Sequence, residues 1–211
     1  MKTSRLALAA LALLLGCTST NNSPPANNSP APTKSEVKAT EAELGRAALQ
    51  KTFIAARGWQ RDAQPYLEFS QPTKEVTGAD GKATVWTASY GSEGRSLGKT
   101  FTWSGTEAAD APPRGLSPTP EDSFSSSNSS THLFDLNYLK TDSDQAFKVA
   151  QEHGGKRLLA KNPAMPVYYR LIWERRDSGL VWHVNYGGTG ADSKLAVTVN
   201  ASTGQFLRKE P

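Results

Sequence analysis

The chain has 211 residues, with 24 lysines and arginines, 20 aspartates and glutamates, three histidines and one cysteine. A single cysteine excludes an internal disulfide, and no two histidines have the spacing of a metal site. The excess of positive charge is small, so the composition does not require a nucleic-acid partner.

The N-terminus has the pattern of a secretory signal peptide. Lys2 and Arg5 precede an apolar run at residues 6–15, which is too short to cross a bilayer as a helix. Cleavage before Cys17 removes two basic residues and no acidic one. The mature chain then carries 22 basic and 20 acidic side chains, a net charge of +2.

The sequence LLGC at residues 14–17 resembles the lipobox of bacterial lipoproteins, in which the cysteine receives a diacylglycerol thioether. Gly16 and Cys17 match, as does the leucine three places before the cysteine, whereas Leu15 departs from the family's small or β-branched residue. The alternative is a cysteine that follows the signal by chance, but lipidation gives the unpaired thiol a role. The resemblance implies a cell-envelope protein held on the membrane by lipid on Cys17. Thr18 indicates the outer membrane, on its periplasmic face, if the source is Gram-negative.

Two segments are poor in large apolar residues. Residues 18–36 consist mostly of Asn, Ser, Pro and Thr, so they cannot bury enough surface to offset their ordering entropy, and we predict a disordered tether. Residues 105–131 have a similar composition. A structureless loop of this length is unusual within one compact domain, so this segment predicts a linker between two folded units.

The two flanking regions share a motif. VWTASYGSEG begins at Val85 and VWHVNYGGTG begins at Val181. At an offset of 96 residues the coincident pairs are Val85/Val181, Trp86/Trp182, Tyr90/Tyr186, Gly91/Gly187 and Gly94/Gly190. Each copy follows a helical pattern and precedes an alternating strand pattern, which indicates a tandem repeat of helix, strand, strand, strand.

The predicted helix ends also correspond. Thr40 with Glu43, and Thr141 with Asp144, have the spacing of a capping box, and Gly58 and Gly154 are placed as C-terminal stops.

These patterns predict an α+β fold of two tandem units, each a helix with a three-stranded antiparallel sheet, packed together by sheet edges or by helix sides. Each unit alone is small for a stable core. The predicted boundaries are a signal peptide at 1–16, the lipidated cysteine and tether at 17–36, the first unit at 37–104, the linker at 105–131 and the second unit at 132–211.

The glycines after the second motif predict a hairpin turn. A phosphate-binding loop needs a helix N-terminus behind it, whereas Gly187, Gly188 and Gly190 are followed by the strand pattern LAVTVN. We therefore expect these glycines to supply positive φ between two strands.

The C-terminal region resembles the PepSY family. Val197 and Val199 alternate in a strand, residues 202–204 form a polar turn with Thr-Gly, and Phe206 with Leu207 gives the closing apolar pair. Asn200 stands where an aspartate is more usual. The resemblance covers residues 142–208 and implies a binding or inhibitory module near the cell surface. It carries no catalytic residues.

The remaining chemistry is sparse. We predict no catalytic residues, no metal site and no cofactor, with His132, His153 and His183 as surface or capping residues. Basic residues are frequent in the second unit, including Arg170, and they form either a solvated basic face or a surface for an acidic partner. Tyr186, His183 and Arg170 are the candidate binding surface.

The expected function is that of a non-enzymatic lipoprotein whose two units bind a protein of the envelope. A protease is the candidate for that bound protein. The alternatives are a structural protein of the envelope and an enzyme whose residues converge only in the folded chain.

Overall fold

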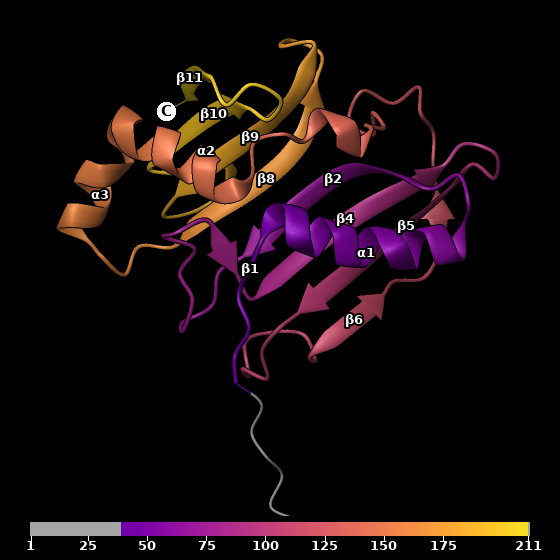
Figure 1. Ribbon diagram of the computed structural model, residues 1–211, viewed down its shortest axis with the longest axis horizontal. Coiled ribbons are helices and arrows are strands. Elements are labelled where there is room, and N and C mark those ends of the chain that lie inside the picture. The colour runs from indigo at the N-terminus through magenta and orange to yellow at the C-terminus, as the bar shows by residue number, and fades with distance from the viewer. Residues whose placement is uncertain (1–38, 211) are drawn as a thin grey trace, which may run out of the picture. The chain divides into compact units, whose positions relative to one another are not determined.

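The computed structural model describes residues 39–210, which belong to one compact unit, residues 38–211. The signal peptide, Cys17 and the predicted tether lie outside the described residues. The main element is a nine-stranded antiparallel sheet (Figure 1). Its strand order is β11 (Phe206–Glu210), β10 (Leu195–Asn200), β9 (Gly179–Tyr186), β8 (Val167–Glu174), β2 (Gln64–Gln71), β4 (Val85–Ser92), β5 (Leu97–Ser104) and β6 (Gly115–Pro118), with β7 (Asp122–Ser123) also paired to β5.

The predicted fold class is wrong, because the strands form one continuous sheet rather than two three-stranded sheets. The join lies between β2 and β8, which pair antiparallel with Leu67 opposite Ile172 and Phe69 opposite Arg170. A three-stranded sheet would leave its edge N–H and C=O groups unpaired, and joining two edges satisfies both. Strands beyond the three predicted for each unit, including β6 and β7 in the predicted linker and β11 at the end of the second unit, make the protein richer in β-structure than the sequence indicated.

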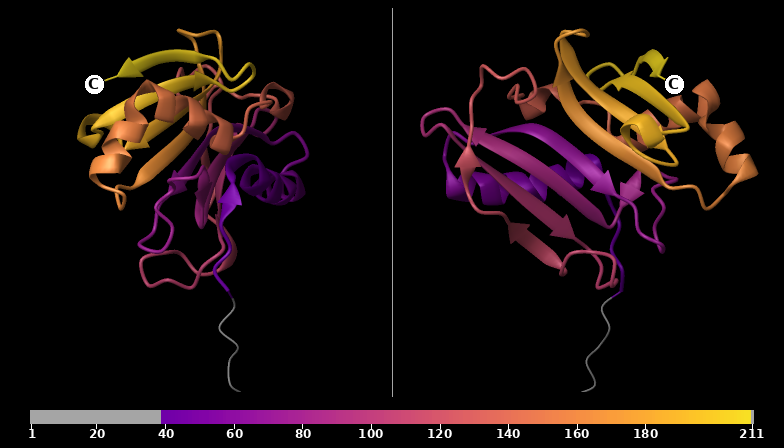
Figure 2. Two further views of the ribbon diagram at one scale, coloured as in Figure 1. Left: turned by 60° about the vertical axis from the view of Figure 1, so that its left-hand side comes forward. Right: turned by 180° about the vertical axis from the view of Figure 1, so that it is seen from behind.

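The helices lie on one face of this sheet (Figures 1 and 2). Helix α1 (Gly45–Trp59) contacts β2, β4 and β5, and α2 (Ser143–Ala150) contacts β9 and β10. A π-helical turn, η2 (Gln151–Gly155), connects α2 to α3 (Lys156–Lys161). The shorter elements are β1 (Glu43–Leu44), β3 (Lys82–Ala83), η1 (Leu136–Tyr138) and η3 (Gly190–Asp192), of which β1 and β3 pair with each other. Among the described residues, no helix combines the length and apolarity needed to cross a membrane.

The aromatic residues of the repeated motif fill the core between helices and sheet. Alternate residues of a strand face the same side, so Trp86 and Tyr90 on β4, and Trp182 and Tyr186 on β9, all point toward the helices and are buried. The Trp86 indole N–H donates to the carbonyl of Glu43 at 3.0 Å, and that of Trp182 donates to the carbonyl of Thr141 at 2.9 Å. In both halves the indole therefore holds the chain that enters a helix.

The predicted capping boxes are displaced. Leu44 precedes α1 and provides no side-chain cap. Asp142 caps α2 in a capping box with Gln145, in place of Thr141 with Asp144. The first N–H groups of α1 are capped from the other half of the molecule, because Gly45 N–H donates to Ser143 Oγ at 2.9 Å and Arg46 N–H donates to Asp142 Oδ1 at 3.0 Å. The residues at the start of α2 thus cap the N-terminus of α1.

Glycine has the predicted role at the hairpin but not at the helix ends. Gly187 and Gly190, with φ of +83° and +58°, confirm the predicted turn with positive φ between β9 and β10, whereas Gly188 does not have positive φ. Gly58 lies inside α1, and Gly154, with φ of +125°, marks a kink within η2 after which the chain becomes helical again as α3.

The segment predicted as a linker, residues 105–131, is attached to the sheet. Besides β6 and β7, it contributes Phe124, which is buried and stacks on Tyr66 with ring centroids 5.7 Å apart. A Cβ atom at Gly91 would lie 2.5 Å from the Phe124 ring, so the ring packs directly against the backbone of β4. This contact ties the segment to the first half of the sheet.

Candidate functional site

The helices α1, α2 and α3 do not cover the face of the sheet opposite them, here called the open face (Figure 2, right). Register partners in an antiparallel sheet point to the same side, so a row of open-face residues can be followed across eight strands. From β11 to β6 this row is Arg208, Thr198, His183, Arg170, Phe69, Thr87, Thr102 and Ser117. The row is charged or ring-bearing on β8, β9 and β11, and consists of hydroxyl side chains on β4, β5 and β6.

A groove of about 700 Å³ is formed on the open face where the two halves of the sheet meet. Its floor and walls come from β2, β8, β9, β10, β11 and the turn between β9 and β10. The residues that line it are Leu67, Phe69, Ser70, Tyr168, Tyr169, Arg170, Glu174, His183, Asn185, Thr189, Gly190, Ala191, Ala196 and Glu210. This is the size of a typical small-ligand site, which occupies roughly 300–1,000 Å³.

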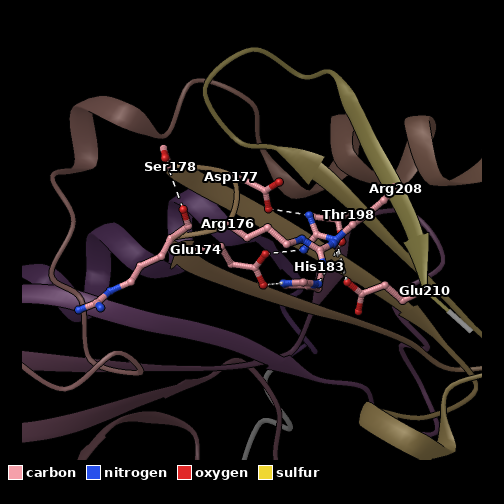
Figure 3. Close-up of polar contacts among 9 residues, drawn as sticks. Glu174, Arg176, Asp177, Ser178, His183, Thr198, Arg208 and Glu210 are labelled. Atoms are coloured by element: carbon pink, nitrogen blue, oxygen red, sulfur yellow. Dashed lines mark hydrogen bonds and ion pairs between the residues drawn. The ribbon is translucent and has the colours of Figure 1, made fainter.

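One wall of the groove is stabilised by Arg208 on β11 (Figure 3). Its Nε donates to Glu210 Oε1 at 2.8 Å, one terminal nitrogen donates to Asp177 Oδ2 at 2.5 Å, and the other donates to Glu174 Oε2. Because Asp177 belongs to the turn between β8 and β9, this guanidinium connects the outer strand to that turn across the open face. All three carboxylates thereby have a cationic partner.

His183 lies between two polar partners. Its Nε2 is 2.8 Å from Glu174 Oε1, and its Nδ1 is 3.3 Å from Thr198 Oγ1. Both ring nitrogens of His183 are therefore engaged, one by a carboxylate and the other by a hydroxyl. A carboxylate, an imidazole and a hydroxyl in this order resemble a hydrolytic triad. Thr198, however, has 0% of its surface exposed, so its hydroxyl does not face the groove as a nucleophile must.

The two acids beside Arg208 differ in their ionisation. Burial by itself would raise the pKa of Glu174, but hydrogen bonds from Arg208 and its neighbours, together with the charge of His183, hold that pKa below its ordinary value. Burial and the adjacent Glu174 carboxylate raise the pKa of Asp177. Within residues 39–210, no group of three or more His, Cys, Asp or Glu side chains is arranged to hold a metal ion.

Several polar groups at the groove have no partner within residues 39–210. Arg170 is exposed and forms no hydrogen bond or ion pair there, and the Asn185 amide and the Tyr168 hydroxyl form no side-chain hydrogen bond. Phe69, the neighbour of Arg170 in the row, is a large apolar side chain with 38% of its surface exposed. The groove therefore presents unused donors beside an aromatic surface.

The structure separates the three residues predicted as a binding surface. Arg170 and His183 are register partners on the open face, whereas Tyr186 points to the opposite side, has 0% exposure and accepts a hydrogen bond from Gln151 Nε2 at 2.8 Å. Tyr186 is therefore a core residue. The sequence analysis missed Phe69 and Asn185. Asn185 could have been found from its even spacing with His183 on one strand face, but no local signal brings Phe69 of β2 to this place.

The other two histidines pack against aromatic rings. His132 stacks on Trp173 with ring centroids 5.1 Å apart, and His153 stacks on Phe206 at 3.6 Å. Neither lines the groove.

Comparisons with known proteins give a fold but no family. No protein-family model matches the chain, and no curated protein matches it. Among solved structures, the chain is similar to a putative lipoprotein from Clostridium difficile 630, with a TM-score of 0.51 and 12% sequence identity. The match covers 77% of this chain and 91% of the other. At this identity the similarity concerns the fold alone.

Proposed function

We propose that this chain is a lipid-anchored protein of the cell envelope whose folded body binds a protein partner, without catalysis, in the groove on the open face. The observation that carries the proposal is the groove itself, where Phe69 is exposed beside the unpartnered Arg170 and Asn185. An apolar surface next to a few unused polar groups is typical of binding sites.

The anchor is supported by three observations. The signal-like N-terminus is followed by Cys17 in a lipobox-like context, and the chain contains no other cysteine. The similar structure from Clostridium difficile bears the description of a lipoprotein, which agrees with a membrane-anchored location in the envelope. The outer membrane is the proposed membrane in a Gram-negative cell, because threonine follows the cysteine.

The anchor is tested by the variant Cys17→Ser. We expect the wild type in the membrane fraction, with a mass increase that accounts for acyl chains, and the variant in the soluble envelope fraction. Separation of inner and outer membranes then identifies the membrane. A variant that stays membrane-bound as the wild type does contradicts lipidation of Cys17.

The nature of the partner rests on a resemblance. Residues 142–208 resemble PepSY modules, which occur in protease propeptides and envelope proteins, and this supports a protease as the partner. The groove adjoins that region, because β8, β9, β10 and β11 contribute most of its walls.

The binding face is tested by a photo-crosslinking amino acid introduced at Phe69 in the full chain, within intact cells. The matched control places it at Ile54, which lies on α1 on the other side of the sheet and is more exposed, at 74%. We expect a discrete crosslinked protein from position 69 and not from position 54. Equal products from both positions, or none from position 69, contradict the proposal.

A further inference from the structure

The charged side chains around the groove differ in whether they have an ion-pair partner. Glu174, Asp177 and Glu210 all contact Arg208, and Glu210 also contacts Arg176 at 3.4 Å. By contrast, Arg170 has no ion pair within residues 39–210 and borders the groove. Each of these acids therefore contacts an arginine, although Arg208 and Arg176 together balance only two of the three carboxylates. Arg170 is the basic side chain that lines the groove and has no ion pair among residues 39–210.

The donors beside Arg170 are arranged by the strand register. Arg170 is opposite His183, and Asn185 is the next residue of β9 on the same face, so Arg170 and Asn185 are diagonal neighbours about 7–8 Å apart. Asn185 is largely buried, which fixes its amide at the groove floor. His183 uses both ring nitrogens on Glu174 and Thr198. The groove thus presents two side-chain donors to a ligand, the Arg170 guanidinium and the Asn185 amide.

On the basis of the proposed function, we infer that the groove binds an acidic segment of the partner protein, with one carboxylate on the Arg170 guanidinium. Arginine matches the two oxygens of a carboxylate with parallel N–H groups, and Asn185 supplies a further donor. Phe69 on one side of Arg170 in the row, and Tyr168 on the same strand face, provide contacts for an apolar side chain next to the acid.

The acidic residues in the walls of the groove also limit the negative charge that a ligand can carry. Glu174 and Glu210 line the same groove, and their negative charge disfavours a dianionic phosphate more than a single carboxylate. The groove volume of about 700 Å³ admits a short stretch of peptide rather than a folded element. The expected ligand is therefore a short acidic motif with an adjacent apolar residue.

The inference is tested by selecting binders from a random peptide library on the full chain, purified in mild detergent. The selected peptides are sequenced, and their affinities are measured for the wild type, Arg170→Gln, Arg170→Lys and Arg157→Gln. Arg157 lies on α3, is exposed and is outside the groove, so its variant matches the change in net charge.

We expect the selected peptides to be enriched in Asp or Glu beside an aromatic or aliphatic residue. Arg170→Gln should weaken their binding at least tenfold, Arg170→Lys less, and Arg157→Gln by less than twofold. Peptides without acidic enrichment that compete with the crosslinked partner would overturn this inference and leave the proposed function intact. A selection that yields no binder contradicts both. Equal losses for Arg170→Gln and Arg157→Gln indicate general charge attraction and also overturn the inference.

Discussion

The two halves of the sheet share the residues that face the helices. In β4 and in β9 the tryptophan of the motif is buried and donates to the backbone before a helix, and the tyrosine is buried with its hydroxyl bonded to the overlying helical segment. The two indoles also meet at the junction, with ring centroids 6.3 Å apart. The repeated motif is therefore a packing motif. The equal spacing of tryptophan and tyrosine in its two copies follows from the contacts between helix and sheet.

The open faces of the same strands differ. On β4 and β5, Thr87 bonds Thr102 at 3.0 Å and Ser89 bonds Thr100 at 2.8 Å, so these hydroxyls satisfy one another. On β8 and β9 the corresponding side is lined by Arg170, His183 and Asn185, with Arg170 and Asn185 unused. Positions that face the helices are therefore constrained by packing, whereas the outward positions differ between the two halves.

The largest expected effect tests whether the halves form one folding unit. Trp86→Ala and Trp182→Ala should each lower the free energy of unfolding by about 3–5 kcal/mol, because each removes a fully buried indole. Guanidinium unfolding followed by circular dichroism and by fluorescence should show one coincident transition for each variant. Two separate transitions, with only the mutated half destabilised, would contradict the prediction that the two halves unfold as one unit.

The second prediction concerns the junction of the two halves, where Glu68 of β2 and Leu171 of β8 are register partners. Glu68 has 0% exposure, and neither of its side-chain oxygens has a hydrogen-bond partner among the described residues. Burial, reinforced by the charge of Asp142, raises the pKa of Glu68 well above its ordinary value.

A carboxyl whose pKa is raised by folding contributes to stability, and this contribution is complete when the pH is below the pKa of the unfolded state. The contribution is lost as the pH rises through the pKa of the folded state. The free energy of unfolding should therefore fall by about 1.4 kcal/mol per pH unit above ~4.5 owing to this residue. Glu68→Gln should remove this slope and be more stable than the wild type at pH 8. Identical pH profiles of the two proteins, from urea titrations, would show that Glu68 is not the titrating group.

The third prediction concerns the cap that one half provides to the other. Asp142→Ala should cost about 2 kcal/mol, because Asp142 accepts from Ser143 N–H at 2.7 Å and from Arg46 N–H of α1 at 3.0 Å. The control Asp144→Ala loses only an exposed ion pair with Lys148 and should cost about 0.5 kcal/mol or less. Equal values in thermal unfolding would mean that the cap on α1 contributes nothing.

The fourth prediction concerns the Arg208 network of the second half. Arg208→Gln should cost about 1–2 kcal/mol at pH 7, a value reduced by the partial exposure of its partners. The lowered pKa of Glu174 favours folding above its unfolded pKa, and this contribution is lost as pH falls through the folded pKa. The difference between wild type and variant should therefore shrink below pH 4. A difference that stays constant down to pH 2 assigns the loss to packing.

The smallest expected effect is at Arg170. Because Arg170 is exposed and has no partner within residues 39–210, Arg170→Gln should change the free energy of unfolding by no more than about 0.5 kcal/mol. Thr102, a residue of the same row in the first half, bonds Thr87, so Thr102→Ala should cost about 1 kcal/mol. A larger loss for Arg170→Gln than for Thr102→Ala, measured by urea unfolding, would reveal a structural role for Arg170.

The sequence by itself determined the local features of this protein. Period-two patterns place the strands that carry Trp86 and Trp182, and the positive φ of Gly187 matches the predicted turn, because these features depend on neighbouring residues along one segment. Arg170 was singled out because basic residues are frequent in that part of the sequence, and the structure places it opposite His183 on one face of the sheet.

Only the tertiary structure decided how these segments combine. The pairing of β2 with β8, the capping of α1 by Asp142 and the burial of Tyr186 depend on contacts between residues far apart in the chain. The groove depends on the same pairing, because β2 brings Phe69 next to Arg170. A sequence pattern shows which edges and donors are unsatisfied within a segment, and the fold decides which distant segment satisfies them.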